Sequence, residues 1–421
     1  MRRTVLFLGL LVLVRPVGAD DGPELTIEQA IAQALSRNPR ISAAHSSADA
    51  ARQGVSAARA LASPEITLAP GLTRYGSDEE LLIAQPLEIS GTRAARTAAA
   101  RAEARAAAAR LDTERLVLTA ETRKAYHSLA ARREALAVAQ AILQIARDLD
   151  HRVARLIEEG SRPGIDRTHA SIEVARARAD LAIASAEADA ARGTLNILMG
   201  LSPSEPIGAL SKLEDLVRAP SDAHDANAGS RTRPEVAEAV AQRDAARQGA
   251  RLAVAETRPD LTVQFRATRL QGGVSETGFG LGIALPFLDW GGRSGRVREA
   301  SAAARAREAE LLAAQARVEM EIFEAQARVH AAEETVGQYR ETLLGQADRL
   351  LNGARTGLVE GKADILTVLE AQRTYRSVQT EYIAALAALA DARAELSRAR
   401  GLMSPADDHD QAPSPAKGTT R

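Results

Sequence analysis

The chain has 421 residues, of which 45% are hydrophobic but only 3% aromatic, so any buried core must pack without many bulky rings. Its 54 basic and 55 acidic residues leave a net charge of -1, and no basic surface predicts binding to nucleic acid. The absence of cysteine excludes disulfides, thiolate metal sites, cysteine nucleophiles and an acylated amino-terminal cysteine.

Residues 1–19 have the pattern of a secretory signal peptide. The start MRR is cationic, TVLFLGLLVLV (4–14) is apolar, and VGA (17–19) supplies small residues for cleavage. Arg15 is unusual in such a segment, and a short uncleaved anchor is the alternative interpretation. No later stretch approaches 18 apolar residues, so the sequence predicts an exported protein without a transmembrane helix.

The remaining sequence contains an internal repeat. The hexapeptide DAARQG stands at residues 49–54 and again at 244–249. Further along, QPLEISGTR (85–93) corresponds to LPFLDWGGR (285–293). Spacing between such correspondences is nearly constant, which indicates one structural unit in two copies.

These correspondences divide the chain into predicted domains. The first repeat covers residues 20–201 and the second covers 233–403. Residues 202–232, rich in Pro, Ser, Asp and Ala, have the composition of a linker. Residues 404–421 have the same character and are expected to be disordered.

Each repeat is predicted to run helix, two short strands, very long helix, tight turn, helix. Residues 93–159 contain no Gly or Pro and are filled with Ala, Arg, Glu and Leu, which favour a helix of roughly 100 Å. Such a rod must pack along neighbouring rods. Apolar side chains recur every seven residues in two stripes, which predicts two flanking helices. The stripes are Leu129, Leu136 and Leu143, and Ile142, Leu149 and Leu156. The other helices are expected at 26–60, 164–200, 233–257, 294–356 and 362–400.

Strands are expected at 64–75, 80–90, 260–271 and 277–288. In the last two, apolar side chains alternate with small or polar ones and define one oily face. That face comprises Leu261, Val263, Phe265, Phe279, Leu281, Ile283 and Leu285. It predicts either an amphipathic hairpin packed on a soluble core or lipid-facing strands of an outer-membrane barrel. Four strands cannot close a barrel, so lipid-facing strands require several chains to share one.

Three segments carry a resemblance to a known family: TIEQAIAQALSRNP (26–39), QPLEISGTRAAR (85–96) and EGKADILTVLEAQ (360–372). In this order, and with their second copies, they make residues 24–403 resemble the TolC family of outer-membrane efflux ducts. QPLE followed by Gly and Arg is most similar to the CzcC-type branch, which is associated with heavy-metal export.

The resemblance implies a mostly α fold with a small β part. Each chain contributes to a long α-helical barrel and gives four strands to a trimeric transmembrane β-barrel. It also implies a homotrimer in the outer membrane of a Gram-negative bacterium, with a periplasmic helical tunnel. The expected partners are a periplasmic adaptor of the membrane-fusion type, an inner-membrane pump of the RND type and outer-membrane lipid.

The same resemblance places the turns at Gly160 and Gly361 at the periplasmic tip. Family members often carry aspartates six and nine residues beyond such turns, where they line a closed aperture. The residues at these places here are Asp166, His169, Thr367 and Glu370. Thr367 departs from the family pattern, whereas a ring of carboxylates from Asp166 and Glu370 would attract cations. The alternatives are a solvated or helix-dipole role for Glu370 and no function for His169.

Nothing in the sequence predicts catalysis, a metal site or a cofactor. The seven histidines are scattered, without an i,i+4 pair or an HExxH motif, and no phosphate-binding loop or GxSxG motif occurs. The resemblance to the TolC family therefore implies an exit duct that passively conducts heavy-metal cations or small toxic molecules. A soluble periplasmic coiled-coil adaptor or scaffold, and a type I protein secretion outlet, are the alternatives.

Overall fold

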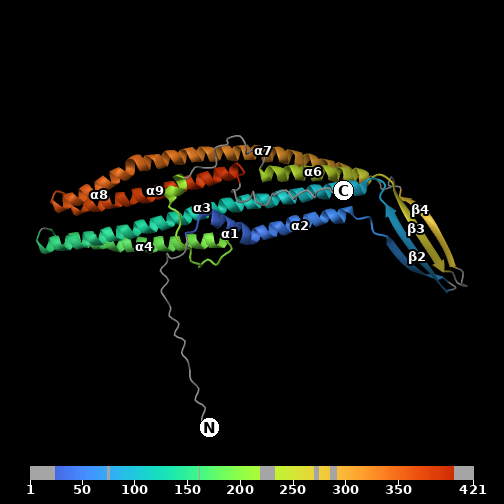
Figure 1. Ribbon diagram of the computed structural model, residues 1–421, viewed down its shortest axis with the longest axis horizontal. Coiled ribbons are helices and arrows are strands. Elements are labelled where there is room, and N and C mark those ends of the chain that lie inside the picture. Colours follow the sequence, from blue (N-terminus) through green and yellow to red (C-terminus); the bar gives the residue numbers. More distant parts are fainter. Residues whose placement is uncertain are drawn as a thin grey trace, which may run out of the picture. The chain divides into compact units, whose positions relative to one another are not determined.

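The computed structural model describes residues 24–73, 76–160, 162–218, 233–269, 275–284 and 292–402. The predicted signal peptide and tail lie outside these residues, as does the part of the predicted linker at 219–232. Within them, one order of elements occurs twice: helix, β-hairpin, long helix, returning helix (Figure 1). The predicted fold class, mostly helical with two antiparallel hairpins, is confirmed.

The first repeat opens on two helices where one was predicted. Its elements are α1 (Ile27–Arg37), α2 (Pro39–Arg59), β1 (Glu65–Thr73), β2 (Gly76–Leu87), α3 (Thr92–Glu158) and α4 (Ile165–Leu198). The prediction of a continuous helix over 26–60 is wrong because Pro39 lacks an N–H and its ring obstructs the preceding turn. Asn38 caps the new helix, and its side chain accepts a hydrogen bond from the Arg40 N–H at 2.9 Å.

The second repeat contains a π-helical turn within its long helix. Its elements are α6 (Pro234–Ala255), β3 (Asp260–Arg269), β4 (Ser275–Ala284), α7 (Gly292–Gln338), the π-helical turn η2 (Tyr339–Leu343), α8 (Leu344–Val359) and α9 (Ile365–Ala399). From Arg293 to Gly361 the chain is one residue longer than from Arg93 to Gly160. A π turn holds one residue more than an α turn, so η2 accommodates the insertion.

Part of the predicted linker is ordered. It contains the short helix α5 (Leu213–Arg218), and Ile207 and Leu213 are buried. Arg133 of α3 donates hydrogen bonds to the carbonyl oxygens of Ile207 and Gly208, at 2.7 and 2.6 Å. The few apolar side chains and the backbone carbonyl groups of this segment anchor it to the helices of unit 1. Its mainly polar composition gave no sign of this anchoring.

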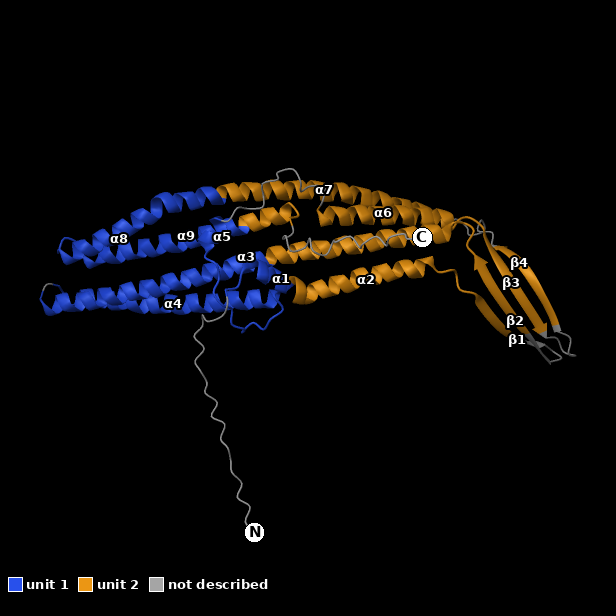
Figure 2. Ribbon diagram, viewed as in Figure 1, with its two compact units in different colours: residues 1–34, 122–220, 332–391 blue, residues 35–121, 221–331, 392–421 orange. Residues whose placement is uncertain are grey.

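The chain forms two compact units (Figure 2). Unit 1 comprises residues 1–34, 122–220 and 332–391, and unit 2 comprises 35–121, 221–331 and 392–421. None of the helices in the ranges described above has an apolar stretch long enough to cross a membrane.

The core of unit 1 follows the two predicted stripes of α3. Ile142 and Leu143 pack with Val174 of α4, and Leu149 packs with Leu351 of α8 and neighbouring side chains of α9. Leu129 is also buried, whereas Leu136 and Leu156 are half-buried. Many of the buried residues are alanines, which allow the helices to approach closely and explain a core with so few aromatic rings.

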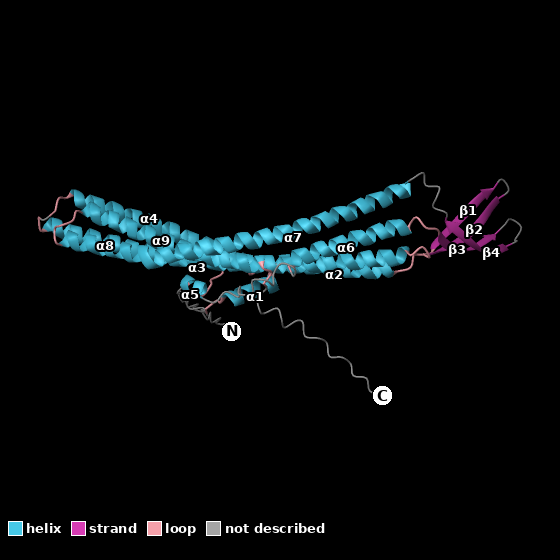
Figure 3. Ribbon diagram, turned by 90° about the horizontal axis from the view of Figure 1, so that it is seen from above, coloured by secondary structure: helices cyan, strands magenta, loops and turns pink. Residues whose placement is uncertain are grey.

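Unit 2 carries the β-sheet, whose strands are antiparallel in the order β1-β2-β3-β4 (Figure 3, magenta). The two hairpins join through β2 and β3, so the central pairing links the first repeat to the second. The outer edges of β1 and β4 have no partner among the strands that the structure describes.

Candidate functional site

The sheet sorts its side chains into two faces. Directly opposed residues of an antiparallel ladder share a face. The register pairs Leu261 with Ile283, Val263 with Leu281 and Phe265 with Phe279, so the six residues predicted to form one oily face do lie together. Leu285 lies outside the described residues. On β1 and β2 the same face continues through Ile66, Leu68, Leu81 and Ile83. We call this set the apolar sheet face.

The apolar sheet face is open. Phe279 exposes 85% of its surface, and Leu281 and Leu68 each expose 74%. Burial of a large apolar side chain is worth about 1.5–3 kcal/mol, so a contiguous exposed set indicates a surface made for an apolar surrounding. The described part of the chain does not bury this face, which argues against a hairpin packed on the subunit's own core.

The opposite sheet face is polar. Thr262, Gln264 and Thr268 alternate along β3 with the apolar residues, and Arg266 pairs with Glu80 of β2 at 2.8 Å. Across the ladder, β4 places Gly278, Gly280 and Gly282 opposite Arg266, Gln264 and Thr262. This face is therefore low in bulk and suited to water.

The two turns between long and returning helices are built on glycine and meet in unit 1. Gly160 and Gly361 have φ angles of 75° and 71°, a left-handed conformation that glycine adopts without steric cost. Arg162 follows the first turn and donates a hydrogen bond to the Ala363 carbonyl oxygen of the second at 2.8 Å. Its guanidinium also lies 3.6 Å from Asp364. The two tips are thus joined within one subunit.

The four predicted aperture residues differ in their exposure. Thr367 and Glu370 lie one turn apart on the exposed surface of α9. His169 is half-buried on α4, and Asp166 is buried in the first turn of that helix. Asp166 and Glu370 therefore do not share one open surface of the subunit, and their role in an aperture stays a prediction.

Sequence reasoning missed the ion pairs that join α4 to α9. Glu173 is buried, and its carboxylate lies 3.4 Å from the Arg373 guanidinium and 3.7 Å from that of Arg176. Arg373 also lies 4.0 Å from Glu370. The i,i+3 spacing of Glu370 and Arg373 predicts an ion pair on one helix. The partner of Arg373 on α4, Glu173, follows only from the packing of the two helices. Because a buried carboxylate is costly without a partner, Arg373 fixes Glu173 in place.

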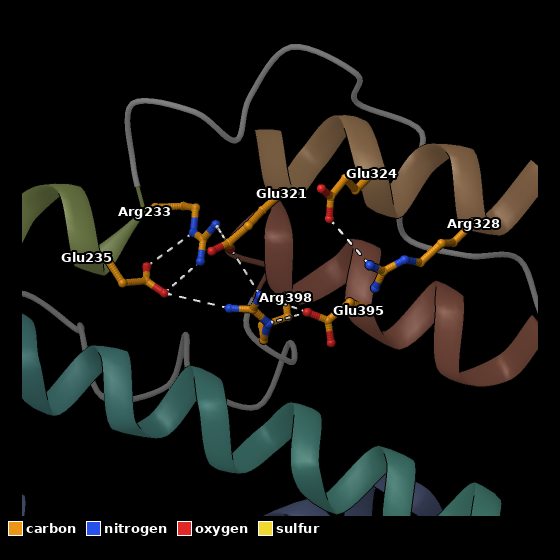
Figure 4. A network of polar contacts seen from close by, with 7 residues as sticks. All are labelled: Arg233, Glu235, Glu321, Glu324, Arg328, Glu395 and Arg398. Atoms are coloured by element: carbon orange, nitrogen blue, oxygen red, sulfur yellow. Dashed lines mark hydrogen bonds and ion pairs between the residues drawn. The ribbon is translucent and has the colours of Figure 1, made fainter. Parts of the chain in front are cut away.

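A second charged cluster, which we call the Arg233 cluster, joins the start of α6 to α7 and α9 (Figure 4). Arg233 is 1% exposed and donates hydrogen bonds to Glu235 at 2.7 Å and to Glu321 at 2.8 Å. Arg398 donates to Glu321 at 3.0 Å and to Glu395 at 2.7 Å. Each of these three carboxylates has a guanidinium partner, so the cluster stabilises the contact between the three helices.

The cluster shifts two protonation equilibria. Burial alone would raise the pKa of Glu321, but the hydrogen bonds and charges of Arg233 and Arg398 outweigh it and hold that pKa below its ordinary value. Burial opposes the charge of Arg398, yet Glu395 and Glu321 raise the pKa of its guanidinium overall. In the described ranges, no three histidine, aspartate or glutamate side chains gather so as to hold a metal ion. The cluster holds the start of α6 against α7 and α9.

Comparison with known proteins places both repeats in one family. Residues 30–201 and 230–402 match the family model described as outer membrane efflux protein. The cobalt-zinc-cadmium resistance protein CzcC of Cupriavidus metallidurans is 28% identical to the chain over 386 residues, 90% of each protein.

Solved structures with the same fold include three channel proteins. The outer-membrane channel OprN superposes with a TM-score of 0.74 at 20% identity and 89% coverage of both chains. CusC gives 0.76 at 17% identity, covering 89% of this chain and 91% of its own. The open state of the Neisseria gonorrhoeae MtrE channel gives 0.74 at 18%, covering 89% and 88%. The predicted resemblance is confirmed, and the chain belongs to the outer membrane efflux protein family.

Proposed function

We propose that the chain is one subunit of a homotrimeric exit duct in a tripartite efflux system. It receives substrate from a periplasmic adaptor and an RND-type inner-membrane pump, and conducts it passively across the outer membrane. The observation that carries this proposal is the apolar sheet face, exposed on a sheet whose two outer edges have no partner among the described strands. Membership of the outer membrane efflux protein family supports the location and the passive role.

A closed sheet requires more than one copy of the chain. The smallest membrane barrels contain about eight strands, whereas one chain supplies the single four-stranded sheet described above. Three copies bring three such sheets together and leave no edge unpaired. The polar sheet face would then line a water-filled lumen, and the apolar sheet face would meet lipid.

We infer that the cargo is a divalent heavy-metal cation. Support comes from the similarity to CzcC, whose name assigns it to cobalt, zinc and cadmium resistance. It also comes from Glu370, whose side chain is 75% exposed beside the tip turn. In this proposal Asp166, His169, Thr367 and Glu370 surround the periplasmic aperture, and the two acids control access.

Cell fractionation and planar bilayers test the proposal together. The protein should remain with the detergent-extracted outer membrane and, once purified, should produce stable single-channel currents. A soluble scaffold would be released with the periplasmic contents and would give no currents. A double variant, Asp166→Ala with Glu370→Ala, should change the conductance. A conductance equal to that of the wild type would show that the two acids do not control the aperture, and it would not contradict the proposed duct.

A further inference from the structure

We propose that unit 1 contains a binding site for inorganic phosphate. The site is a cavity of about 130 Å³ between α3, α8 and α9. Its polar lining consists of Asp148 and Arg152 of α3, Arg355 of α8 and Gln372 of α9, and the rest of the lining is aliphatic. All of these residues belong to unit 1, so the site lies within one subunit and is independent of the proposed duct.

The cavity connects the surface of unit 1 with its apolar core. Asp148 and Arg152 are exposed, and their spacing along α3 places them on one face of that helix. Leu149 of α3 and Leu358 of α8 also line the cavity, and both are buried in the core of unit 1. Gln372 is buried on α9 beside them. The cavity therefore extends from two charged groups at its mouth to a buried amide at the edge of the core.

The Gln372 side chain is the observation that points to a ligand. The residue is 2% exposed, and neither its carboxamide oxygen nor its carboxamide nitrogen has a hydrogen-bond partner among the residues that the structure describes. Burial of an unpaired amide is costly, so a partner from outside the chain is expected in the space that this amide lines. That partner must accept a hydrogen bond from the amide nitrogen and donate one to the amide oxygen.

Arg152 and Arg355 provide two guanidinium groups for an anion. Within the described ranges, neither guanidinium group has an ion-pair or hydrogen-bond partner. By contrast, the guanidinium group of Arg373 on α9 lies 3.4 Å from the Glu173 carboxylate. Arg355 is half-buried, and a guanidinium group in that position without a carboxylate partner favours an anionic ligand.

The charge of the lining favours an anion over a metal cation. Two guanidinium groups outweigh the single carboxylate of Asp148, which is exposed and accepts a hydrogen bond from Gln144 at 3.0 Å. The oxygen atoms that the lining offers to a cation, those of Asp148 and Gln372, lie beside these two positive groups. The planar fork of a guanidinium group matches the oxygen atoms of a carboxylate or a phosphate. The ligand is therefore expected to be a small oxyanion.

Among small oxyanions, phosphate satisfies both atoms of the buried amide. Its unprotonated oxygen atoms accept hydrogen bonds from the two guanidinium groups and from the Gln372 nitrogen. Near neutral pH it also keeps an O–H group, which donates to the Gln372 oxygen, whereas sulfate has no proton and leaves that oxygen unpaired. A water molecule needs about 10–15 Å³ of such space, so the cavity has room for a phosphate ion.

The site lies close to the tip turns of unit 1. Arg152 and Arg355 precede Gly160 and Gly361 by about two helical turns, and Gln372 follows Gly361 by about three. Bound phosphate would therefore join α3 of the first repeat to α8 and α9 of the second repeat next to their turns. We expect the ligand to stabilise this end of unit 1 and to offset the charge of the two arginines.

Calorimetric titration of inorganic phosphate into the detergent-solubilised protein, in phosphate-free buffer, tests the site. The wild type should bind phosphate, and its Tm should rise with the phosphate concentration. Arg355→Met and Gln372→Leu should each weaken the affinity about 10-fold, because each removes a hydrogen bond to the anion. The matched control Arg349→Met removes an exposed arginine of α8 outside the cavity lining and should bind like the wild type. A wild type that shows neither binding heat nor a Tm shift would overturn the inference and leave the cavity to water.

Thermal stability separates a binding role of Gln372 from a purely structural one. In phosphate-free buffer the Tm of Gln372→Leu should be no lower than that of the wild type, because leucine leaves no buried polar group unpaired. With phosphate the order should reverse, since the wild type gains more from the ligand. A variant with a lower Tm in both buffers would assign Gln372 to the fold and overturn the inference.

Sulfate in place of phosphate tests the choice of ligand. It should bind the wild type about 10-fold more weakly, because it cannot donate to the Gln372 oxygen. Equal affinity for the two anions would overturn the assignment of phosphate. Fractionation and bilayer currents, which test the proposed duct, are independent of both outcomes.

Discussion

Arg233 occupies, at the start of the second repeat, the place that Asn38 holds in the first, and its guanidinium meets Glu321 at 2.8 Å. The exchange has a clear electrostatic cause. Where the first repeat pairs Arg40 with Glu121, the second places the two acids Glu235 and Glu321. Arg233 lies between these acids and converts a repulsive pair into a bridged one.

Removal of Arg233 should therefore be costly. Arg233→Asn leaves Arg398 as the remaining guanidinium neighbour given for both Glu235 and Glu321, and we expect a loss of about 1–3 kcal/mol in the free energy of unfolding. Adding Glu235→Arg to this variant rebuilds the pattern of the first repeat and should recover part of the loss. Denaturant unfolding in detergent measures both, and a double variant no more stable than Arg233→Asn would contradict the explanation.

The same cluster predicts a loss of stability in acid. The pKa of Glu321 is lower in the folded protein than its ordinary value of 4.5, so its contribution is complete above that pH. The contribution disappears as the pH falls below 4.5 through the folded-state pKa. Unfolding free energies measured from pH 7 downwards should fall less steeply for Glu321→Gln than for the wild type. Parallel pH profiles would show that Glu321 carries no such linkage.

The tip turns should not tolerate a side chain. Gly361→Ala forces a left-handed backbone on alanine and should cost about 1–2 kcal/mol, visible as a lower Tm. Gly353→Ala is the matched control because Gly353 lies within α8 and a Cβ there meets no atom within 4 Å. The control should raise the Tm, since alanine favours helix by about 1 kcal/mol over glycine.

Charge at the aperture should govern ion preference. Replacing Glu370 by Gln removes an exposed carboxylate from each subunit and should move the zero-current potential under a salt gradient towards the non-selective value. Glu319→Gln removes an exposed carboxylate from α7, away from the tip turns in sequence, and should leave the potential unchanged. Equal shifts in both variants would indicate a general charge effect rather than an aperture.

A lysine substitution should impair membrane insertion on one sheet face and leave it unchanged on the other. Phe279→Lys places a charge on the apolar sheet face and should reduce insertion into the outer membrane, since a basic residue facing lipid costs about 2–4 kcal/mol near the midplane. Gly278→Lys, one position away on the polar face, has open space for its side chain and should insert normally. Heat-modifiability on gels reports the inserted trimer, and equal defects would argue against the assignment of the faces.

Periodic features of the sequence predicted most of the fold. Heptads on α3 indicated its two neighbours, and alternation on β3 and β4 indicated the apolar sheet face, because both depend on local geometry that repeats along an element. The pair Asn38-Pro39 also held a legible signal for a helix start, which a reading by length alone overlooked.

Periodic features do not predict contacts between segments that are distant in the sequence. The burial of Asp166 and the pairing of Glu173 with Arg373 depend on how α4 and α9 turn about their axes, which spacing along one helix does not determine. The Arg233 cluster unites residues from the two ends of the second repeat. Comparing the two repeats position by position at Asn38 and Arg40 would have drawn attention to it.

The turn η2 explains how the two halves of the gene product have been able to drift apart in length. An extra residue in a regular α-helix rotates everything downstream by 100° and would swing a whole contact surface away from its neighbour. Taking up that residue in a single wide turn leaves α8 in phase, so Leu351 and Leu358 still point into the core of unit 1. The second repeat thus absorbs its one extra residue at this place, and the core positions on both sides of the turn keep their counterparts in the first repeat.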